Sequence, residues 1–348
     1  MNLSKGTQQM PVVITGAGGR IGSAVANRLL DAGHRIHAID VVGSPAVDAL
    51  VARGAAAFIG TLDNTAMLAE ALTDADAVVH TGAVLSSHGK SDDLLISTNF
   101  VGTYNLLVAA RDNAPRLRRF VNFSSDAVYW GGSVPPVDVL PVDEHFPRTG
   151  SSVYAATKVG AEQLATSFLH TYGLPTLTIR PTMTAAPSEL LVPDSVFGRR
   201  WFVGGALRWW DSRATLSSAD AEVRDMLRDG DIGLDDLFVV IDPDGTSPLT
   251  MLNDARDVAA GVCLALDAPD AVGQAFNLGS TEFTERALVD HIAARLGRRV
   301  HVLTHPGHRP SWYISSLKAR SVLGYRPQHD VFSMVDEALR AQNGTELP

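Results

Sequence analysis

The sequence predicts an α/β protein with a doubly wound parallel sheet and a smaller, irregular C-terminal part. Short apolar, β-rich runs alternate with helical patterns through the first half of the chain, as at residues 11–15 and 35–40. A glycine-rich turn at residues 16–22 joins the first run to the first helical pattern, and the alternation stops after residue 181. Strands that alternate with helices indicate a parallel sheet with helices on both faces.

The first half of the chain is a regular series of expected strands and helices. The extended runs are residues 11–15, 35–40, 57–60, 77–80, 119–124 and 175–180. The first helix is expected because apolar residues recur there at four-residue spacing, at Ile21, Val25 and Leu29. The other helices expected in this half are a long one over residues 92–113 and one that begins near Tyr154.

The second half is less regular. Residues 182–250 contain prolines, three tryptophans and an acidic stretch, 220–244, that we interpret as a loop. Regular patterns then return, with helices expected at 254–266, at 284–296 and from about 331, and extended segments at 274–278 and 299–303. No internal repeat and no low-complexity linker is evident, so we expect the two parts to be joined without a flexible tether.

Composition excludes several classes of protein. The 348 residues are 45% apolar and 19% charged, as in ordinary globular proteins. With 29 basic and 38 acidic residues the net charge is −9, so nucleic acid and anionic membrane are poor partners. The single cysteine, Cys263, cannot form an internal disulfide and is expected on a buried helix face. The first ten residues do not resemble a signal peptide and no apolar run reaches membrane-spanning length, so we expect a cytoplasmic protein.

The glycine-rich turn is the strongest local signal. Gly16, Gly19 and Gly22 follow the first strand at three-residue spacing. Glycines at such places allow a tight turn and a close approach of the backbone to a pyrophosphate, to which the helix N-terminus at Arg20 and Ile21 offers amide donors. The alternative is a glycine-rich turn without a ligand. The position between strand and helix favours a dinucleotide site, and with it a Rossmann-type sheet.

An acidic residue indicates which dinucleotide is bound. Asp40 ends the second expected strand, eighteen residues beyond Gly22, and no Arg or Lys follows it within ten residues. A carboxylate at that place accepts hydrogen bonds from a ribose diol and repels a 2′-phosphate. NAD is therefore expected rather than NADP, although an aspartate can also simply end a strand.

These motifs define the expected organisation. Residues 1–181 are predicted to form an NAD-binding Rossmann domain, which a returning segment at about 251–280 completes. Residues 182–348 are predicted to form mainly a substrate-binding cap.

Tyr154 and Lys158 are candidate catalytic residues. Four residues apart on a helix, they share one face, so the ammonium can approach the phenol. A positive charge beside a phenol lowers its pKa from about 10 toward the range of a proton-transfer catalyst. The alternative is a solvated helical face, since this spacing also occurs by chance.

The glycine spacing and the Tyr154–Lys158 pair together resemble the extended short-chain dehydrogenase/reductase group, the NAD-dependent epimerase/dehydratase family. Further segments resemble that family's motifs, so that the resemblance spans about residues 11–330: they are residues 79–83, 99–107, 121–129, 254–259, 273–277 and 323–327. The resemblance implies that Ser125, Tyr154 and Lys158 are catalytic. It also implies that further residues contact the cofactor, namely Thr61, Leu62, Thr81, Gly82, Ala83 and Asn99. For Asn99, an amide that kinks or caps a helix is an equal alternative.

The chain departs from the family pattern at several positions. Ala127 stands where the family's 4,6-dehydratases carry a glutamate, which argues against a dehydratase. Thr182–Thr184 after Arg180 lacks the asparagine common in nucleotide-sugar epimerases, which weakens a nucleotide-sugar substrate. Thr61 replaces a frequent aspartate beside the adenine, and Trp130 replaces a usual glycine and is expected to narrow the substrate mouth.

Three tryptophans and two histidines in the second half of the chain lie outside these motifs. The tryptophans of the cap, Trp201, Trp209 and Trp210, suit a lid or a sugar-stacking platform, but core packing or a subunit contact is the interpretation we favour. His305 and His308 lie in a Pro/Gly loop without nearby acids, so we expect no metal site.

The sequence therefore predicts an NAD-dependent oxidoreductase that acts on a secondary alcohol or ketone of a sugar, polyol or related small molecule. The first alternative is an epimerase that oxidises and reduces again without net redox change. The second is a non-catalytic NAD-sensing protein, against which the intact set of Ser125, Tyr154 and Lys158 argues. The resemblance also implies a homodimer formed through the helices that begin near Asp92 and Tyr154.

Overall fold

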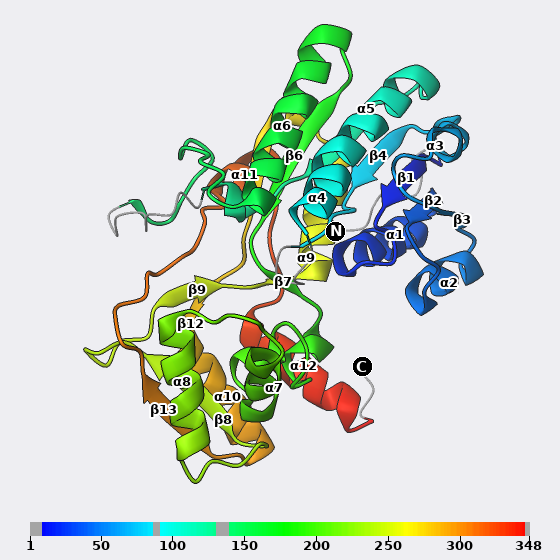
Figure 1. The fold of residues 1–348 in the computed structure, drawn as a ribbon. Helices are drawn as coiled ribbons and strands as arrows, with labels where there is room; N and C mark the ends of the chain where they lie inside the picture. The colour runs from blue at the N-terminus through cyan, green and yellow to red at the C-terminus, as the bar shows by residue number, and fades with distance from the viewer. Residues whose placement is uncertain (1–8, 86–90, 130–138, 345–348) are drawn as a thin grey trace.

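A seven-stranded parallel sheet lies at the centre of the computed structural model, which describes residues 9–85, 91–129 and 139–344. Its strand order is β11-β6-β5-β4-β1-β2-β3 (Figure 1). The strands are β1 Pro11–Thr15, β2 Arg35–Asp40, β3 Ala56–Ile59, β4 Ala77–His80, β5 Arg119–Phe123, β6 Thr176–Pro181 and β11 Ala275–Leu278. The predicted fold class is confirmed, while Trp130 lies outside the described residues.

The strand order places a switch point at β1. The chain runs from β1 outward to β2 and β3, then returns to add β4 on the other side of β1. The register pairs Thr15 with Ile39 of β2 and with His80 of β4, so the carboxyl ends of these strands lie at one edge. Ligands of doubly wound sheets bind outside the carboxyl ends of the strands at such a point.

Helices cover both faces of the sheet. Those of the first half are α1 Arg20–Asp31, α2 Pro45–Ala52, α3 Thr65–Leu72, α4 Asp92–Leu95, α5 Gly102–Asn113 and α6 Val153–Tyr172. The expected helix over 92–113 contains a π-helical segment, η2 Ile96–Val101, between α4 and α5. A short 3-10 helix, η3 Asp126–Tyr129, follows β5.

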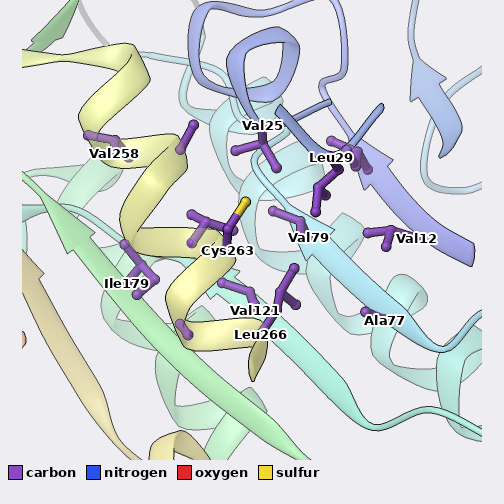
Figure 2. Close-up of a cluster of buried hydrophobic side chains, with 14 of the residues drawn as sticks. Val12, Val25, Leu29, Ala77, Val79, Val121, Ile179, Val258, Cys263 and Leu266 are labelled. Carbon is purple, nitrogen blue, oxygen red and sulfur yellow. The ribbon is translucent and has the colours of Figure 1, made fainter. Parts of the chain in front are cut away.

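The core has one apolar cluster on each face. Helices α1 and α9 (Ala255–Asp267) pack against Val12, Val79, Val121 and Ile179, and Cys263 lies buried among them as predicted (Figure 2). On the opposite face, side chains of α3, α5 and α6 cover the other residues of the same strands. Alternate residues of each central strand therefore face different helices, as a sheet buried on both sides requires.

The second half returns to the central sheet twice. Strand β11 pairs in parallel with β6 and forms one edge of the central sheet. Helix α9 packs on α1. Ala319 of α11 (Leu317–Val322) and Tyr325 pack into the same core. This second return of the chain to the Rossmann core was not predicted from the sequence.

The remaining elements gather beyond the carboxyl end of β6 (Figure 1). They are β7 Thr184–Ala185, η5 Pro187–Leu190, η6 Gly198–Arg200, α7 Val203–Asp211, α8 Ser218–Asp229, β8 Leu237–Ile241, β9 Leu249–Met251, β10 Asn253–Asp254, β12 Glu282–Thr284, α10 Glu285–Leu296, β13 Val300–Thr304 and α12 Val331–Gln342. The short 3-10 helix η7 Pro269–Ala271 instead lies between α9 and β11, and its Ala271 belongs to the core cluster of α1 and α9. Three two-stranded sheets, β10-β7, β12-β9 and β13-β8, connect them.

The prediction of a loop over residues 220–244 is wrong, because this stretch contains most of helix α8 and strand β8. Helix α8 begins at the N-cap Ser217, which accepts a hydrogen bond from the amide of Asp220, and buries Val223 and Leu227 four residues apart. Its exposed face is so rich in Asp and Arg that the charged composition hides the apolar stripe. β8 pairs with β13 and is a short β-rich run, which is typical of a strand.

The tryptophans of the cap fit the packing interpretation. Trp201 is 2% exposed and donates a hydrogen bond of 2.8 Å from Nε1 to the carbonyl of Leu190. Trp210 is buried against Phe238. Trp209 is half-buried, with the guanidinium carbons of Arg199 and Arg213 at 4.5 and 4.9 Å from its ring centroid.

Among the described residues, none of the helices has the length and apolar content needed to cross a membrane.

Candidate active site

The glycine-rich turn adopts a backbone that side chains would disrupt. Gly16 has a φ of +65°, and a Cβ on it would lie 2.7 Å from the Cα of Gly82, in the loop after β4. A Cβ on Gly22 would lie 2.1 Å from the carbonyl oxygen of Gly16. Both glycines are therefore required for α1 to pack this closely on β1 and β4. Gly19 is the N-cap of α1 and offers no side-chain acceptor to the first-turn amides.

Asp40 lies beside this turn. Its Oδ2 accepts a hydrogen bond of 2.8 Å from the amide of Gly18, and its Oδ1 accepts one of 2.8 Å from the amide of Val41. The carboxylate therefore lies at the end of β2 next to the glycine loop. In dinucleotide-binding folds an acidic residue at this place accepts hydrogen bonds from the hydroxyls of the ribose. Its setting fits a dinucleotide that lacks a 2′-phosphate.

Arg20 connects the turn to the cap. Its Nε and Nη2 donate hydrogen bonds to the two carboxylate oxygens of Glu189, and its guanidinium carbon lies 5.3 Å from the ring centroid of Phe197. Glu189 also accepts a hydrogen bond of 2.8 Å from the amide of Ala186. Ile21 follows in the first turn of α1 and is half-buried.

The other predicted cofactor residues lie along the carboxyl edge of the sheet. Thr81 donates a hydrogen bond of 2.6 Å to the carbonyl of Thr15, and the amide of Gly82 donates one of 3.2 Å to the hydroxyl of Thr15. Ala83 continues this segment and is half-buried. After β3, the exposed Thr61 donates to the carboxylate of Asp63.

Two predicted contacts lie around the π-helical segment. Leu62 packs beside Gly102, where a Cβ would lie 3.1 Å from the leucine Cδ1. Asn99 is 1% exposed, and its amide exchanges hydrogen bonds of 2.8 and 2.9 Å with the backbone of Val84 and donates one of 3.3 Å to Thr157. These contacts fit a structural role for Asn99, because both protons of its amide nitrogen are donated within the protein.

Ser125, Tyr154 and Lys158 converge at the carboxyl end of β5. Ser152 caps α6 by accepting a hydrogen bond of 3.1 Å from the amide of Ala155, which starts the helix just before Tyr154. Ser125 is within hydrogen-bond reach of the Tyr154 phenol. Lys158 lies one turn further along α6, with its Nζ 5.9 Å from the centroid of the Tyr154 ring.

The pKa of Tyr154 corrects one expectation. Burial raises it to about 12, a hydrogen bond with Ser125 opposes that rise, and the negative charge of Asp126 adds to it. The predicted lowering by Lys158 is therefore wrong for this arrangement. The ammonium donates a hydrogen bond of 2.9 Å to the carbonyl of Phe123 instead of to the phenol. Burial also lowers the pKa of Lys158 to about 8, so the ammonium is mostly charged at neutral pH and loses its proton at mildly alkaline pH.

Sequence reasoning missed three residues next to this group. Asp126 follows Ser125 and is 9% exposed, and Trp312 reaches it from the distant C-terminal segment. His80 ends β4 and is buried between two threonines. Asp126 and His80 stood inside motifs, but no local pattern indicates that Trp312 contacts Asp126 or that Glu189 contacts Arg20.

His80 links the glycine loop to the π-helical segment. Thr103 donates its proton to the carbonyl of Asn99 at 2.6 Å, so the Nε2 of His80, 2.9 Å from Thr103 Oγ1, must carry a proton. The Nδ1, 2.6 Å from Thr15 Oγ1, then accepts a hydrogen bond. The imidazole is neutral because burial lowers its pKa to about 3.

The site fits a dinucleotide on the observations above. Glycines that tolerate no Cβ line the turn, uncapped amides begin α1, and the carboxylate of Asp40 lies at the end of the next strand. NAD would be held by these groups, with its nicotinamide end toward Ser125, Tyr154 and Lys158.

Comparison with known proteins agrees with this geometry. Residues 12–198 match the NAD dependent epimerase/dehydratase family. A ketoreductase of Stigmatella aurantiaca, acting on 4-hydroxy-2-methyl-3-oxo-4-farnesyl-3,4-dihydroquinoline-1-oxide, is 30% identical over 56% of this chain and 58% of its own. The chain spans about half the length of several such curated relatives. A UDP-glucose 4-epimerase of Mycolicibacterium smegmatis is 28% identical over 92% of this chain and 94% of its own.

The fold has a well-matched solved structure. A short-chain dehydrogenase/reductase superfamily protein of Agrobacterium tumefaciens, crystallised with bound NAD, is 29% identical. It superposes with a TM-score of 0.84 over 96% of this chain and 97% of that one.

Proposed function

Because the chain belongs to the NAD dependent epimerase/dehydratase family, we propose that it is an oxidoreductase that transfers hydride reversibly at a secondary alcohol or ketone. The predictions of the family and of NAD as its cofactor are confirmed by the family match and by the NAD-bound relative. The substrate class, a sugar, polyol or related small molecule, is part of the proposal.

One observation carries the proposal: Ser125, Tyr154 and Lys158 come together at the carboxyl end of β5, beyond the glycine turn. Tyr154 exchanges the hydroxyl proton of the substrate, as a base in oxidation and an acid in reduction. Ser125 holds the reacting oxygen by a hydrogen bond. Lys158, which the carbonyl of Phe123 orients, supplies a positive charge one helical turn away. When bound, NAD would supply the hydride acceptor for oxidation and, in its reduced form, the hydride donor for reduction.

The names of the relatives support net redox chemistry. The Stigmatella relative is named a ketoreductase, and a second curated relative, 30% identical over 49% of this chain, is named a 3-beta-hydroxysteroid dehydrogenase. In both names a carbonyl and a carbinol are interconverted, which is the chemistry that a proton-exchanging phenol serves.

The test is a search for NADH formation. Purified protein and NAD are incubated with panels of polyols, sugars, sugar acids and simple secondary alcohols while the absorbance of NADH is followed. We expect NADH to accumulate with at least one panel, and to stay at background when NADP replaces NAD because Asp40 repels a 2′-phosphate. No NADH with any panel would contradict the proposal.

An epimerase is the second candidate, favoured by the epimerase of Mycolicibacterium smegmatis that aligns over nearly the whole chain. An epimerase regenerates its cofactor, so it would convert a sugar substrate to its epimer while NADH stays at background. Product analysis by NMR with UDP-glucose and free sugars separates the two candidates.

We also propose a homodimer through the helices that begin near Asp92 and Tyr154. In support, α4, η2 and α5 expose four large apolar side chains, Leu94, Ile96, Val101 and Tyr104. Light scattering after gel filtration should give twice the chain mass of 37.0 kDa, and Tyr104→Lys should reduce it to one chain. A monomeric wild-type protein would exclude the dimer.

A further inference from the structure

Two arginines of the cap share one tryptophan ring. Arg199 belongs to η6, and Arg213 follows the C-terminal end of α7, which carries Trp209. Their guanidinium carbons lie over the Trp209 ring, 4.5 and 4.9 Å from its centroid. A guanidinium that stacks on an aromatic ring keeps the N–H groups along its edge available to acceptors. Trp209 therefore holds two hydrogen-bond donor groups at one place on the cap.

Neither arginine has an acidic partner. Within residues 9–85, 91–129 and 139–344, the side chains of Arg199 and Arg213 form no hydrogen bond and no ion pair. The acidic residues closest to them in the chain, Asp194 and Asp211, instead accept hydrogen bonds from two other arginines. The N–H groups of both guanidiniums are thus unused by the described part of the protein.

The fold does not balance the positive charge at this place. Arg200, next to Arg199, is paired with Glu285 at 2.6 Å. Burial and the positive charges of Arg213 and Arg200 lower the pKa of Arg199, and no described carboxylate opposes them. The C-terminal end of α7 offers only about half an elementary negative charge to two full cations. A local excess of positive charge therefore remains on a chain whose net charge is −9.

We propose that Arg199, Arg213 and Trp209 form a binding site for a phosphate group, either free or in a phosphate monoester. A guanidinium can donate two parallel hydrogen bonds to the oxygens of one phosphate, and such charge-assisted bonds are stronger than neutral ones. Because Trp209 already holds both side chains, little of their rotational freedom is lost when the anion binds. The site only binds its ligand, and no covalent bond forms or breaks in it.

The test measures phosphate binding to the NAD-bound protein, in which the glycine turn is already occupied. Inorganic phosphate and methyl phosphate are titrated calorimetrically at constant ionic strength, with sodium chloride as the balancing salt. We expect saturable binding, and the probe that binds more tightly identifies the source of the phosphate. Tryptophan fluorescence is followed in the same titrations, and its change on binding should disappear in Trp209→Phe, which locates the anion at this ring.

Arg199→Gln and Arg213→Gln should each weaken phosphate binding at least about fivefold, because each removes one charged donor group. Arg208→Gln is the matched control. Arg208 is an exposed residue of α7 that donates a hydrogen bond of 2.7 Å to Asp194, so its loss removes an equal charge without touching the proposed site. Its phosphate affinity should match that of wild type, and NAD affinity should be unchanged in all three variants.

Absence of saturable phosphate binding by the wild-type protein, or equal losses in the three variants, would overturn the proposal. A loss of NAD affinity in Arg199→Gln or Arg213→Gln would also overturn it, since the guanidiniums would then serve the cofactor. If circular dichroism shows that Arg199→Gln does not fold, Arg213→Gln decides, because Arg213 is exposed. The titration uses no alcohol, so its result does not depend on the proposed hydride transfer.

Discussion

Arg20 and Glu189, 169 residues apart in the chain, form a two-point ion pair that joins the glycine turn to the segment after β6. The pair neutralises the one cation of the turn at the place where the pyrophosphate of a dinucleotide is expected. We therefore expect Glu189 to oppose cofactor binding in two ways, by occupying Arg20 and by repelling the phosphates.

Glu189→Gln should bind NAD about three- to tenfold more tightly, the scale of one partly exposed charge contact, and Arg20→Gln should weaken binding by a similar factor. Calorimetric titration measures both. Asp31→Asn removes an exposed carboxylate at the far end of α1 and should leave the affinity unchanged. Weaker NAD binding by Glu189→Gln would show that the pair instead holds the cleft in shape.

Tyr154→Phe tests the assigned proton exchange. Without the hydroxyl we expect turnover to fall at least about a hundredfold, while NAD affinity changes little because the ring is retained. Tyr172→Phe, at the exposed end of the same helix, is the matched control and should keep wild-type turnover. A loss of only a few-fold in Tyr154→Phe would remove the phenol from the mechanism.

Gly22→Ala tests the packing of α1 on the sheet. The added Cβ would meet the carbonyl oxygen of Gly16 at 2.1 Å, so the first turn of α1 must move away from the glycine loop. We expect NAD affinity to fall at least about tenfold, since backbone amides there must approach the pyrophosphate closely. Gly43→Ala, where a Cβ meets nothing within 4 Å, should bind NAD normally. Equal affinities in the two variants would place the cofactor elsewhere.

The sequence predicted those parts of the site that depend on local pattern. The glycine turn follows from the spacing of Gly16, Gly19 and Gly22 between a strand and a helix, and the approach of Lys158 to Tyr154 follows from helical periodicity. Both depend on residues close together in the chain, so their geometry is largely determined before any tertiary contact is known.

Contacts between distant segments could not be predicted. The partners of Arg20 and Asp126 are 169 and 186 residues away, and no periodicity relates them. The pKa of Tyr154 differs from expectation for a related reason. Spacing along a helix predicts how close an ammonium comes, but burial and the charge of a residue on another element decide the sign of the shift.

His80 should make stability depend on pH. Its pKa is about 3 in the folded protein and about 6.5 when unfolded, so between these values the unfolded chain binds the extra proton and stability falls as the pH falls. At neutral pH, His80→Gln should be less stable than wild type by about 1–3 kcal/mol, because hydrogen bonds to Thr15 and Thr103 are lost.

The contribution of His80 is isolated by comparing how the free energies of unfolding of wild type and His80→Gln change with pH. Between pH 7 and about pH 4.5, wild type should lose about 2–3 kcal/mol more of its free energy of unfolding in urea than His80→Gln does. Other groups titrate equally in both proteins and cancel. Parallel pH profiles would mean that His80 is protonated in the folded state.

Glu162 takes part in two ion pairs, one buried and one partly exposed, whose contributions to stability can be compared. Its carboxylate accepts hydrogen bonds of 2.8 and 2.7 Å from Arg180, and both side chains are at most 4% exposed. It also accepts one of 2.6 Å from Arg148, whose side chain is 37% exposed. Arg180 in turn donates to Tyr129, which donates to Asn277 of the edge strand β11.

Glu162→Gln would leave the Arg180 guanidinium buried without its counter-charge, so we expect the free energy of unfolding to fall by about 3–5 kcal/mol. Arg148→Gln removes a partner that water can replace, and its cost should stay below about 1 kcal/mol. Urea unfolding of the two variants at neutral pH measures both. Because β11 belongs to the returning second half, a large loss in Glu162→Gln should also detach β11, seen as faster amide exchange at its pairing with β6. Similar small costs for both variants would mean that the hydrophobic clusters alone hold β11 in the sheet.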